Sequence, residues 1–385
     1  MKILLVTHRF PPSIGGMENQ CYELYQGLKK NFNVELYKMP EKANHLWWLL
    51  QLGKNLQKHL RKNNDITHVY FNDGLIATAA AAVKKTSTVH TMATIHGLDI
   101  VYPASIYQKK IINNLNANID SVISVSTATA EECISRGVNP EKVFIVPNGV
   151  DLSLKDIKPE KSFPALVEEY KLPDLKNKKI IISIGRAVRR KGFSWFLEKV
   201  LPLLGSEYYY IMIGPPQKKL FLFRILSAVL PEYLKRLIEL SGVGMDQIRI
   251  KKLLKRNDIK AKASHIGKIP FKDLVLFAKN SSVFIMPNIH IEGDAEGFGL
   301  VALEAVMNGT IPVVADIEGI TEAIKDGKNG FYAKSRDASD WVAKFNEITG
   351  PDFKRKNFIA KSIKFTENNF SWSKMVEGYS RIILK

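Results

Sequence analysis

The sequence predicts an α/β protein with two doubly wound domains, each built on a parallel β-sheet, that face a cleft. Its 385 residues exceed the ~100 to 200 residues of an ordinary single domain. Short apolar runs alternate with helical patterns almost throughout, and such alternation is typical of βαβ units on a parallel sheet. Because ligands of such sheets bind beyond the carboxyl ends of the strands, polar residues that follow each run are candidate site residues.

The first series of strand-like runs predicts the sheet of an N-terminal domain, residues 1–155. The runs are KILLVT (2–7), VELYKM (34–39), HVYF (68–71), MATIH (92–96), SVISVS (121–126) and VFIVP (143–147).

The second series predicts the sheet of a C-terminal domain, residues 178–368. The runs are KKIIISIG (178–185), YYYIMIG (208–214), ASHIGKI (263–269), SVFIMP (282–287), TIPVVAD (310–316) and NGFYA (329–333). A Pro- and Lys-rich stretch with weak periodicity precedes this series and predicts a linker over 156–177. Residues 369–385 are expected to form a C-terminal helix that packs back on the N-terminal domain.

Composition favours a soluble globular protein, with 45% apolar and 24% charged residues. The first residues hold too few consecutive apolar side chains for a signal peptide, and no run approaches the ~18 that a membrane span needs. Cys21 and Cys133 lie far apart without metal-type spacing, which favours a reducing cytoplasm. The net charge of +18 indicates a partner of opposite sign: nucleic acid, anionic lipid or a phosphorylated substrate.

Two short motifs after strands of the N-terminal domain are open to a structural or a functional interpretation. Gly15 and Gly16 follow the first run and precede a helical pattern, where glycine lets the backbone approach a ligand and free N–H groups attract phosphate. They would serve equally well as a simple strand-to-helix turn. His96 ends the run before Gly97 and is suited to hydrogen bonding or proton exchange near neutral pH, although most such histidines are structural.

The stretch IGRAVRRKGF (184–193) predicts an anion site. Four cations, Arg186, Arg189, Arg190 and Lys191, follow a fully apolar strand beside glycines. Helix N-termini disfavour cations, so a solvated basic helix start is the weaker interpretation, and guanidinium geometry suits a diphosphate.

The stretch EGDAEGFGLVALEAVMNG (292–309) lies between two strands and predicts a loop followed by a helix. The helix is expected to begin near Gly299 and to end at Asn308–Gly309. Its residues are mostly apolar, so Glu304 is expected to be buried and to need hydrogen-bond donors. Glu296 precedes the turn, and a carboxylate accepts hydrogen bonds from the adjacent hydroxyls of a sugar or ribose.

Together these motifs resemble the retaining GT-B glycosyltransferases of family four, over essentially the whole chain. Glu296 and Glu304 match the family's Glu-x7-Glu motif, and GR (185–186) with KG (191–192) matches its phosphate-binding pair. Further matches are Gly16 in the first loop, VPNGVD (146–151), DGKNGF (326–331) and FSW (370–372).

The resemblance implies a role for each site residue. Arg186 and Lys191 would neutralise the donor diphosphate, assisted by Gly16 and by the amides of Phe298, Gly299 and Leu300 next to Gly297. Glu296 would hold hydroxyls of the transferred sugar, Glu304 the ribose, and His96 would lie beside the sugar at the reacting centre. The base would rest near Ile269. No protein nucleophile is expected, because such enzymes are thought to use front-face attack.

The chain departs from the family's pattern in two places. Glu292 and Asp294 are extra acids before the motif, and Glu318–Gly319 stands where many relatives have two glycines. Glu292, Asp294 and Glu296 also resemble a metal site of alternate carboxylates. Since cations already supply the neutralising charge, no metal and no cofactor is expected. The role of Glu292 and Asp294 is left open between sugar choice and acceptor approach.

Two segments are candidates for a contact with an anionic membrane surface. Residues 46–62 place Leu46, Leu49, Leu50, Leu56 and Leu60 on one stripe, which suits an ordinary helix packed on its leucines, yet Trp47–Trp48 beside cations suits a bilayer interface. Residues 217–262 join an apolar stretch (217–240) to a basic one (249–262), a pattern that suits a membrane, a lipid-carried acceptor or an oligomer contact.

The resemblance, taken with the cysteine usage and the basic charge, therefore implies a cytoplasmic hexosyltransferase, peripheral on the inner membrane face. It would use a nucleotide-sugar and a glycan or lipid-linked acceptor in bacterial surface polysaccharide or lipopolysaccharide synthesis. One alternative is a sugar-nucleotide epimerase on the same scaffold, for which only His96 offers acid/base chemistry. The other is a basic nucleic-acid-binding protein. No nucleic-acid module is present in the sequence, so nucleic acid is not expected as a partner.

Overall fold

The computed structural model describes residues 1–13, 15–215 and 246–385. Contacts divide the chain into two compact units. Unit 1 comprises Met1–Val150, Ala295–Leu300 and Phe370–Lys385, and unit 2 comprises Asp151–Asp294 and Val301–Asn369. The predicted apolar segment 217–240 lies outside the described residues. Each unit is α/β, as predicted, and carries one parallel sheet.

The sheet of unit 1 has six parallel strands in the order β2-β1-β3-β4-β5-β6. All six predicted runs of the first series form strands. Their bounds are β1 Lys2–Thr7, β2 Asn33–Lys38, β3 His68–Phe71, β4 His90–Ile95, β5 Ser121–Ser124 and β6 Val143–Ile145.

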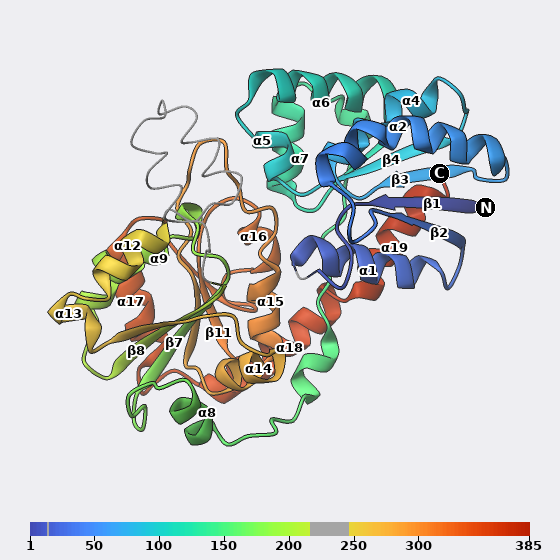
Figure 1. The fold of residues 1–385 in the computed structure, drawn as a ribbon. Coiled ribbons are helices and arrows are strands. Elements are labelled where there is room, and N and C mark those ends of the chain that lie inside the picture. Colours follow the sequence, from blue (N-terminus) through green and yellow to red (C-terminus); the bar gives the residue numbers. More distant parts are fainter. Residues whose placement is uncertain (14, 216–245) are drawn as a thin grey trace. The chain divides into compact units, whose positions relative to one another are not determined.

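Helices cover both faces of this sheet, with α2, α4 and α6 on one face and α1 and α19 on the other (Figure 1). The helices are α1 Gly16–Leu28, α2 His45–Lys62, α3 Gly74–Ala77, α4 Ala80–Lys84, α5 Leu98–Val101, α6 Ser105–Asn118, α7 Thr127–Ser135 and α19 Trp372–Ile383. A short 3-10 turn, η1 Pro140–Lys142, precedes β6.

The sheet of unit 2 also has six parallel strands, in the order β12-β11-β10-β7-β8-β9. The second series of predicted runs is confirmed as well. The bounds are β7 Lys179–Ile184, β8 Tyr208–Ile213, β9 Ala263–Ile266, β10 Val283–Met286, β11 Ile311–Ala315 and β12 Phe331–Ala333.

The connections of unit 2 are helices and short turns. The longer ones are α8 Phe163–Glu169, α12 Asp246–Leu253, α14 Phe271–Lys279, α15 Leu300–Met307, α17 Ala338–Thr349 and α18 Arg355–Asn369. The shorter ones are η2 Leu152–Asp156, η3 Arg189–Lys191, α9 Phe193–Trp195, η4 Phe196–Val200, η5 Leu201–Leu203, α13 Asn257–Lys260 and α16 Ile320–Ala323.

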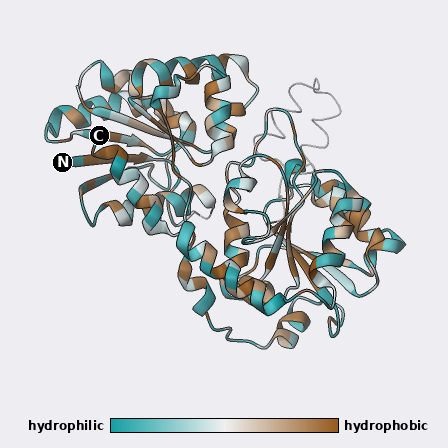
Figure 2. Ribbon diagram, turned by 180° about the vertical axis from the view of Figure 1, so that it is seen from behind, coloured by the Kyte–Doolittle hydropathy of each residue, from teal (hydrophilic) through white to brown (hydrophobic). Residues whose placement is uncertain are grey.

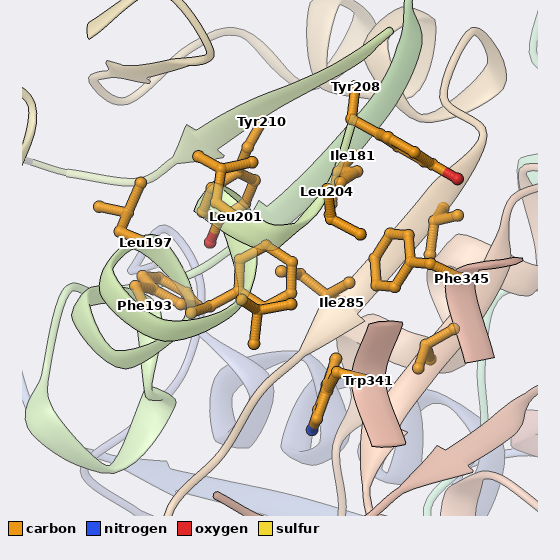
Figure 3. Packing of buried hydrophobic residues seen from close by; sticks show 14 of the residues in the cluster. Ile181, Phe193, Leu197, Leu201, Leu204, Tyr208, Tyr210, Ile285, Trp341 and Phe345 are labelled. Carbon is orange, nitrogen blue, oxygen red and sulfur yellow. The ribbon is translucent and has the colours of Figure 1, made fainter. Parts of the chain in front are cut away.

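Large aromatic side chains fill the core on one side of the unit 2 sheet (Figure 3). Phe196 makes edge contacts with Tyr210 and Trp341 at centroid distances of 5.1 and 5.7 Å. Such pairs contribute about 0.5–1.5 kcal/mol each beyond the area that they bury. The aromatic contacts pack η4 against β8 and α17, and β8 lies beside β7, the strand whose loop carries Arg186 and Lys191.

The segment predicted as a linker, residues 156–177, lies within unit 2 and packs on α14. Leu166 of α8 is fully buried, and the Tyr170 hydroxyl donates to Asp273 of α14 at 2.8 Å. Lys161 approaches the same carboxylate at 3.4 Å. Residues 161–170 are thereby held against α14.

Hydrophobic residues are concentrated in the strands and hydrophilic residues on the outer turns and loops (Figure 2). Among the described residues, no helix is long and apolar enough to cross a membrane.

The predicted leucine stripe of α2 is wrong for two of its members. Leu46 and Leu50 are exposed, whereas Leu56 and Leu60 are buried together with Leu52. A turn of 3.6 residues places Leu52, Leu56 and Leu60 on one line and Leu46 and Leu50 away from it.

Candidate functional site

The strand order of unit 2 marks one place at its sheet edge where a ligand is expected. The chain runs from β7 through β8 to β9 and then returns to the other side of β7 to form β10. The loops that follow the neighbouring strands β7 and β10 therefore run in opposite directions along the sheet edge. The place where they part is the topological switch point, at which ligands bind open α/β sheets. Both predicted motifs of the C-terminal half, 184–193 and 292–309, follow these two strands.

The loop after β7 carries the predicted diphosphate ligands. Lys191 is the one lysine that is buried within the described ranges, while Arg186 is exposed. Gly192 adopts a left-handed conformation with φ of 67°, and a Cβ there would lie 1.7 Å from the carbonyl oxygen of Pro287. Glycine at this position thus lets the β7 loop pack directly on the end of β10.

The loop after β10 is tied to the β7 loop by an ion pair that the sequence did not predict. Arg190 Nε lies 3.0 Å from Asp294 Oδ1, with only 15% and 11% of the two side chains exposed. Residues 291–294 form a tight turn in which the Asp294 N–H donates to the Ile291 carbonyl at 2.9 Å, and Gly293 supplies the positive φ. Asp294 therefore positions this loop, and Arg190 contacts Asp294 in addition to standing in the predicted anion site.

The extra acids do not form a metal cluster in the described part of the chain. No group of three or more His, Cys, Asp or Glu side chains there could hold a metal ion. Glu292 is exposed, and Asp294 is engaged by Arg190.

The helix of the motif, α15, forms where it was predicted, from Leu300 to Met307. Glu304 is half-buried rather than fully buried. Desolvation nevertheless raises the pKa of its carboxyl group to about 7, and Asp151 contributes a smaller upward effect. Its side chain has no hydrogen bond or ion pair among the described residues, so it can accept hydrogen bonds from a ligand. Ile269, the residue predicted to lie near the nucleotide base, is buried and follows β9 of unit 2.

The segment Ala295–Leu300 belongs to unit 1, where its glycines touch the end of β4. A Cβ on Gly297 would lie 1.9 Å from the His96 carbonyl oxygen, and a Cβ on Gly97 would lie 3.1 Å from the Gly297 Cα. Phe298 is buried against Phe370 at a centroid distance of 6.2 Å. Leu300 Cδ1 lies 3.3 Å from where a Gly16 side chain would begin. The structure thus brings Gly16, His96 and residues 297–300 together.

His96 is held by its ring and by its backbone. Its Nε2 lies 2.8 Å from the Asn72 carbonyl oxygen, which can only accept, so Nε2 carries the proton and Nδ1 is the remaining ring nitrogen. The His96 N–H donates to Asp99 Oδ1 at 3.0 Å, and the Gly74 N–H donates to Asp99 Oδ2 at 3.0 Å. Burial raises the pKa of Asp99. This carboxyl joins the loops after β3 and β4.

Sequence reasoning missed a buried polar cluster at the switch point of unit 1, between β1 and β3. His8 Nδ1 lies 3.2 Å from Asp73 Oδ2, but the geometry is not that of a hydrogen bond. Neither these two atoms nor Asn72 Nδ2 has a hydrogen-bond partner among the described residues. Burial lowers the pKa of His8 to about 3, so its ring is neutral. Polar residues directly after the first and third apolar runs, in THR (7–9) and FND (71–73), were the signal that could have revealed this cluster.

Two parallel doubly wound sheets, each with polar residues at its switch point, define the architecture of the GT-B glycosyltransferases. Family comparison agrees: the family described as Glycosyl transferases group 1 matches residues 168–365, and Glycosyltransferase Family 4 matches residues 14–154. The chain belongs to the glycosyl transferases group 1.

Individual relatives are distant. An uncharacterized glycosyltransferase of Methanocaldococcus jannaschii is 25% identical over 89% of this chain and 87% of its own length. The N,N'-diacetylbacillosaminyl-diphospho-undecaprenol alpha-1,3-N-acetylgalactosaminyltransferase of Campylobacter jejuni is 25% identical over 68% of this chain and 60% of its own length. The Anabaena protein HepE, solved with UDP-glucose, shares the fold with a TM-score of 0.74 at 16% identity, covering 100% of this chain and 99% of that chain.

Proposed function

We propose that this glycosyltransferase moves a hexose from a nucleotide diphosphate-sugar to a hydroxyl group of a glycan acceptor. The observation that carries the proposal is the switch point of unit 2, where the buried Lys191 follows β7 and the Glu304 helix follows β10. A cation and a hydrogen-bond acceptor on neighbouring strands suit a diphosphate attached to a ribose. HepE, which has the same fold, was solved with UDP-glucose.

Each predicted site residue has a role in this proposal. Arg186 and Lys191 neutralise the diphosphate, and Glu304 accepts hydrogen bonds from the ribose. Glu296 holds hydroxyls of the transferred sugar, and His96 lies beside that sugar with its Nδ1 as the remaining ring nitrogen. The other donor contacts are Gly16, Ile269, Gly297, Phe298, Gly299 and Leu300.

The proposed reaction retains the configuration at the anomeric carbon. The bond from this carbon to the diphosphate oxygen breaks, a bond to the acceptor oxygen forms on the same face, and the acceptor proton passes to the departing phosphate oxygen. Positioning of the two substrates and stabilisation of the leaving diphosphate by cations would supply the rate enhancement. The proposal needs no metal, because Arg186 and Lys191 provide positive charge.

We further propose a lipid-linked acceptor, at the cytoplasmic face of the membrane, in bacterial surface polysaccharide or lipopolysaccharide synthesis. The Campylobacter relative carries a diphospho-undecaprenol acceptor in its name. The net charge of +18 suits an anionic lipid diphosphate and an anionic membrane surface.

The test is release of nucleoside diphosphate from a panel of UDP-, GDP- and ADP-sugars, with and without lipid-linked acceptors. We expect acceptor-dependent release, with kcat/KM lowered about 10²- to 10³-fold by Lys191→Ala and by Glu304→Gln. Lys199→Ala and Glu347→Gln, at exposed positions of the same unit, serve as matched controls and should leave the rate unchanged. Turnover that persists in the two site variants would show that the site assignment is wrong. Acceptor-free conversion of a nucleotide-sugar into its epimer, without net release of nucleoside diphosphate, would favour an epimerase.

The stereochemistry and the metal requirement are tested on the same reaction. Proton NMR of the first product should show the anomeric configuration of the donor, and a chelator should leave the rate unchanged. An inverted product would contradict front-face attack, and loss of activity restored by a divalent cation would contradict a metal-independent reaction.

A further inference from the structure

The outer surface of α2 begins with large apolar side chains that face away from the protein. Leu46, Trp47 and Leu50 are 67%, 63% and 68% exposed. The side chains of α2 that pack on the core of unit 1 are different ones: Leu52, Leu56 and Leu60 are buried, and Trp48 and Leu49 pack against the same cluster. The three exposed residues are therefore not needed to hold the helix in place.

The same outer surface continues into a row of cations. Lys54, Lys58 and Arg61 are exposed and follow Trp47 by 7, 11 and 14 residues, which places all four on one side of the helix. Residues 44–62 contain no acidic residue. This α2 face, defined as Leu46, Trp47, Leu50, Lys54, Lys58 and Arg61, joins an apolar end to a cationic end.

A second helix on the same side of the unit 1 sheet repeats the pattern on a smaller scale. Ile106, near the start of α6, is 85% exposed, and Lys109 and Lys110 follow it on the exposed surface. Because α2 and α6 each connect two parallel strands, both begin at the carboxyl-end edge of the sheet, and both lie over the same face (Figure 1). The apolar ends of the two helices therefore lie at the same edge of the sheet.

The basic segment of unit 2 lacks this combination in its described part. Ile250, Leu253 and Ile259 are buried in the core of unit 2, so the apolar residues of α12 and α13 face inward. Both arginines of residues 246–262 are in ion pairs, Arg249 with Glu198 and Arg256 with Asp258. Within residues 246–262, charge is present without an exposed apolar counterpart.

We propose that the α2 face docks on the surface of an anionic lipid bilayer. Tryptophan and leucine side chains enter the boundary between head groups and acyl chains, while lysine and arginine attract anionic head groups, at about a fivefold gain in partition for each cation. The row of cations without an acid complements a bilayer of one charge sign better than it complements a second copy of this basic chain. The inference rests on the proposed function in one respect, since a lipid-linked acceptor is presented at such a surface.

The test is co-flotation of the full-length protein with vesicles of phosphatidylcholine alone or of equal parts phosphatidylcholine and phosphatidylglycerol. We expect binding to the anionic vesicles that weakens with added salt. The double variants Trp47→Ser with Leu50→Ser, and Lys54→Glu with Lys58→Glu, should each lower the partition by about tenfold or more. Matched controls on unit 2 are Leu203→Ser and Lys361→Glu with Lys364→Glu, whose residues are likewise exposed, and these should bind as the wild type does.

Equal binding by the α2 variants and the wild type, or no binding of the wild type to anionic vesicles, would overturn the proposal. So would a dimer that depends on Trp47 and forms without lipid, because the face would then be a protein contact. Nucleoside diphosphate release with a soluble acceptor analogue separates this result from the proposed function. If vesicle binding fails while transfer persists, only the docking inference falls; if transfer fails while vesicle binding persists, only the proposed function falls.

Discussion

At the scale of single residues, Glu304 gives the proposed donor site a pH dependence. Its pKa is raised to about 7 because burial disfavours the charged form, and ribose hydroxyls hydrogen-bond best to that charged form. Nucleoside diphosphate affinity should therefore increase about tenfold between about pH 6 and about pH 8, as the carboxyl group ionises. Glu304→Gln should bind more weakly and lose most of this dependence in titration calorimetry. An identical pH profile in wild type and variant would show that Glu304 does not bind the nucleotide.

Gly297 offers a steric test of the contact between residues 295–300 and His96. A methyl group at Gly297 would lie 1.9 Å from the His96 carbonyl oxygen, and a backbone atom cannot move aside as a flexible side chain can. Gly297→Ala should therefore displace the segment that carries Glu296 and lower kcat/KM at least about tenfold.

Gly327→Ala is the matched control, because a Cβ at Gly327 would meet no atom within 4 Å. Its φ of 68° is unfavourable for alanine, so this variant has backbone strain without a steric clash. The strain should lower the free energy of unfolding by about 1 kcal/mol, which is measured as a lower melting temperature. Turnover should remain unchanged. Full activity in Gly297→Ala would contradict the close approach.

At the scale of elements, the ion pair between Arg190 and Asp294 links the loops after β7 and β10. Because both side chains are mostly buried, Asp294→Ala should lower the free energy of unfolding by about 1–3 kcal/mol in urea titrations. Glu292→Ala, two residues away at an exposed position, should change it by less than about 0.5 kcal/mol. A double-mutant cycle with Arg190→Met should give a coupling energy of about 0.5–3 kcal/mol, and additive effects would show that the pair contributes nothing.

The elements themselves show which features a sequence predicts. All twelve predicted strands form, most of them because a strand buried on both faces is a short run of apolar residues. The edge strands β2 and β6 are the least buried of the twelve. The periodicity of α2 could not decide whether Trp47 or Trp48 faces the core. Residues 46–50 are all apolar, so every side of the first turn of the helix looks equally suited to the core. Only the packing of α2 places Trp48 inside and Trp47 outside. Asp294 and Arg190 are separated by about a hundred residues, and their pairing depends on two loop conformations that no local pattern specifies.

At the scale of the whole molecule, the end of the chain completes the unit in which the chain begins. The Val150 N–H donates to the carbonyl oxygen of Phe370, 220 residues further along the chain, at 2.7 Å. The next residues form α19, whose Met375, Val376 and Tyr379 belong to one core cluster with Ile3 and Leu5 of β1. The stability of unit 1 therefore depends on residues that follow all of unit 2 in the sequence.

Tyr379 tests this dependence. Its ring is fully buried, and its hydroxyl is 2.8 Å from Thr94 Oγ1 of β4 and 3.2 Å from Gln20 Nε2 of α1, so one side chain joins three elements. Tyr379→Ala should destabilise unit 1 by about 3–5 kcal/mol, and Tyr379→Phe, which keeps the ring, by about 1 kcal/mol. Limited proteolysis should then cut residues 1–150 before residues 151–369. Arg381→Ala, at an exposed position of the same helix, should leave the order and rate of cleavage unchanged. Earlier cleavage of unit 2 in Tyr379→Ala would show that α19 stabilises the other unit instead.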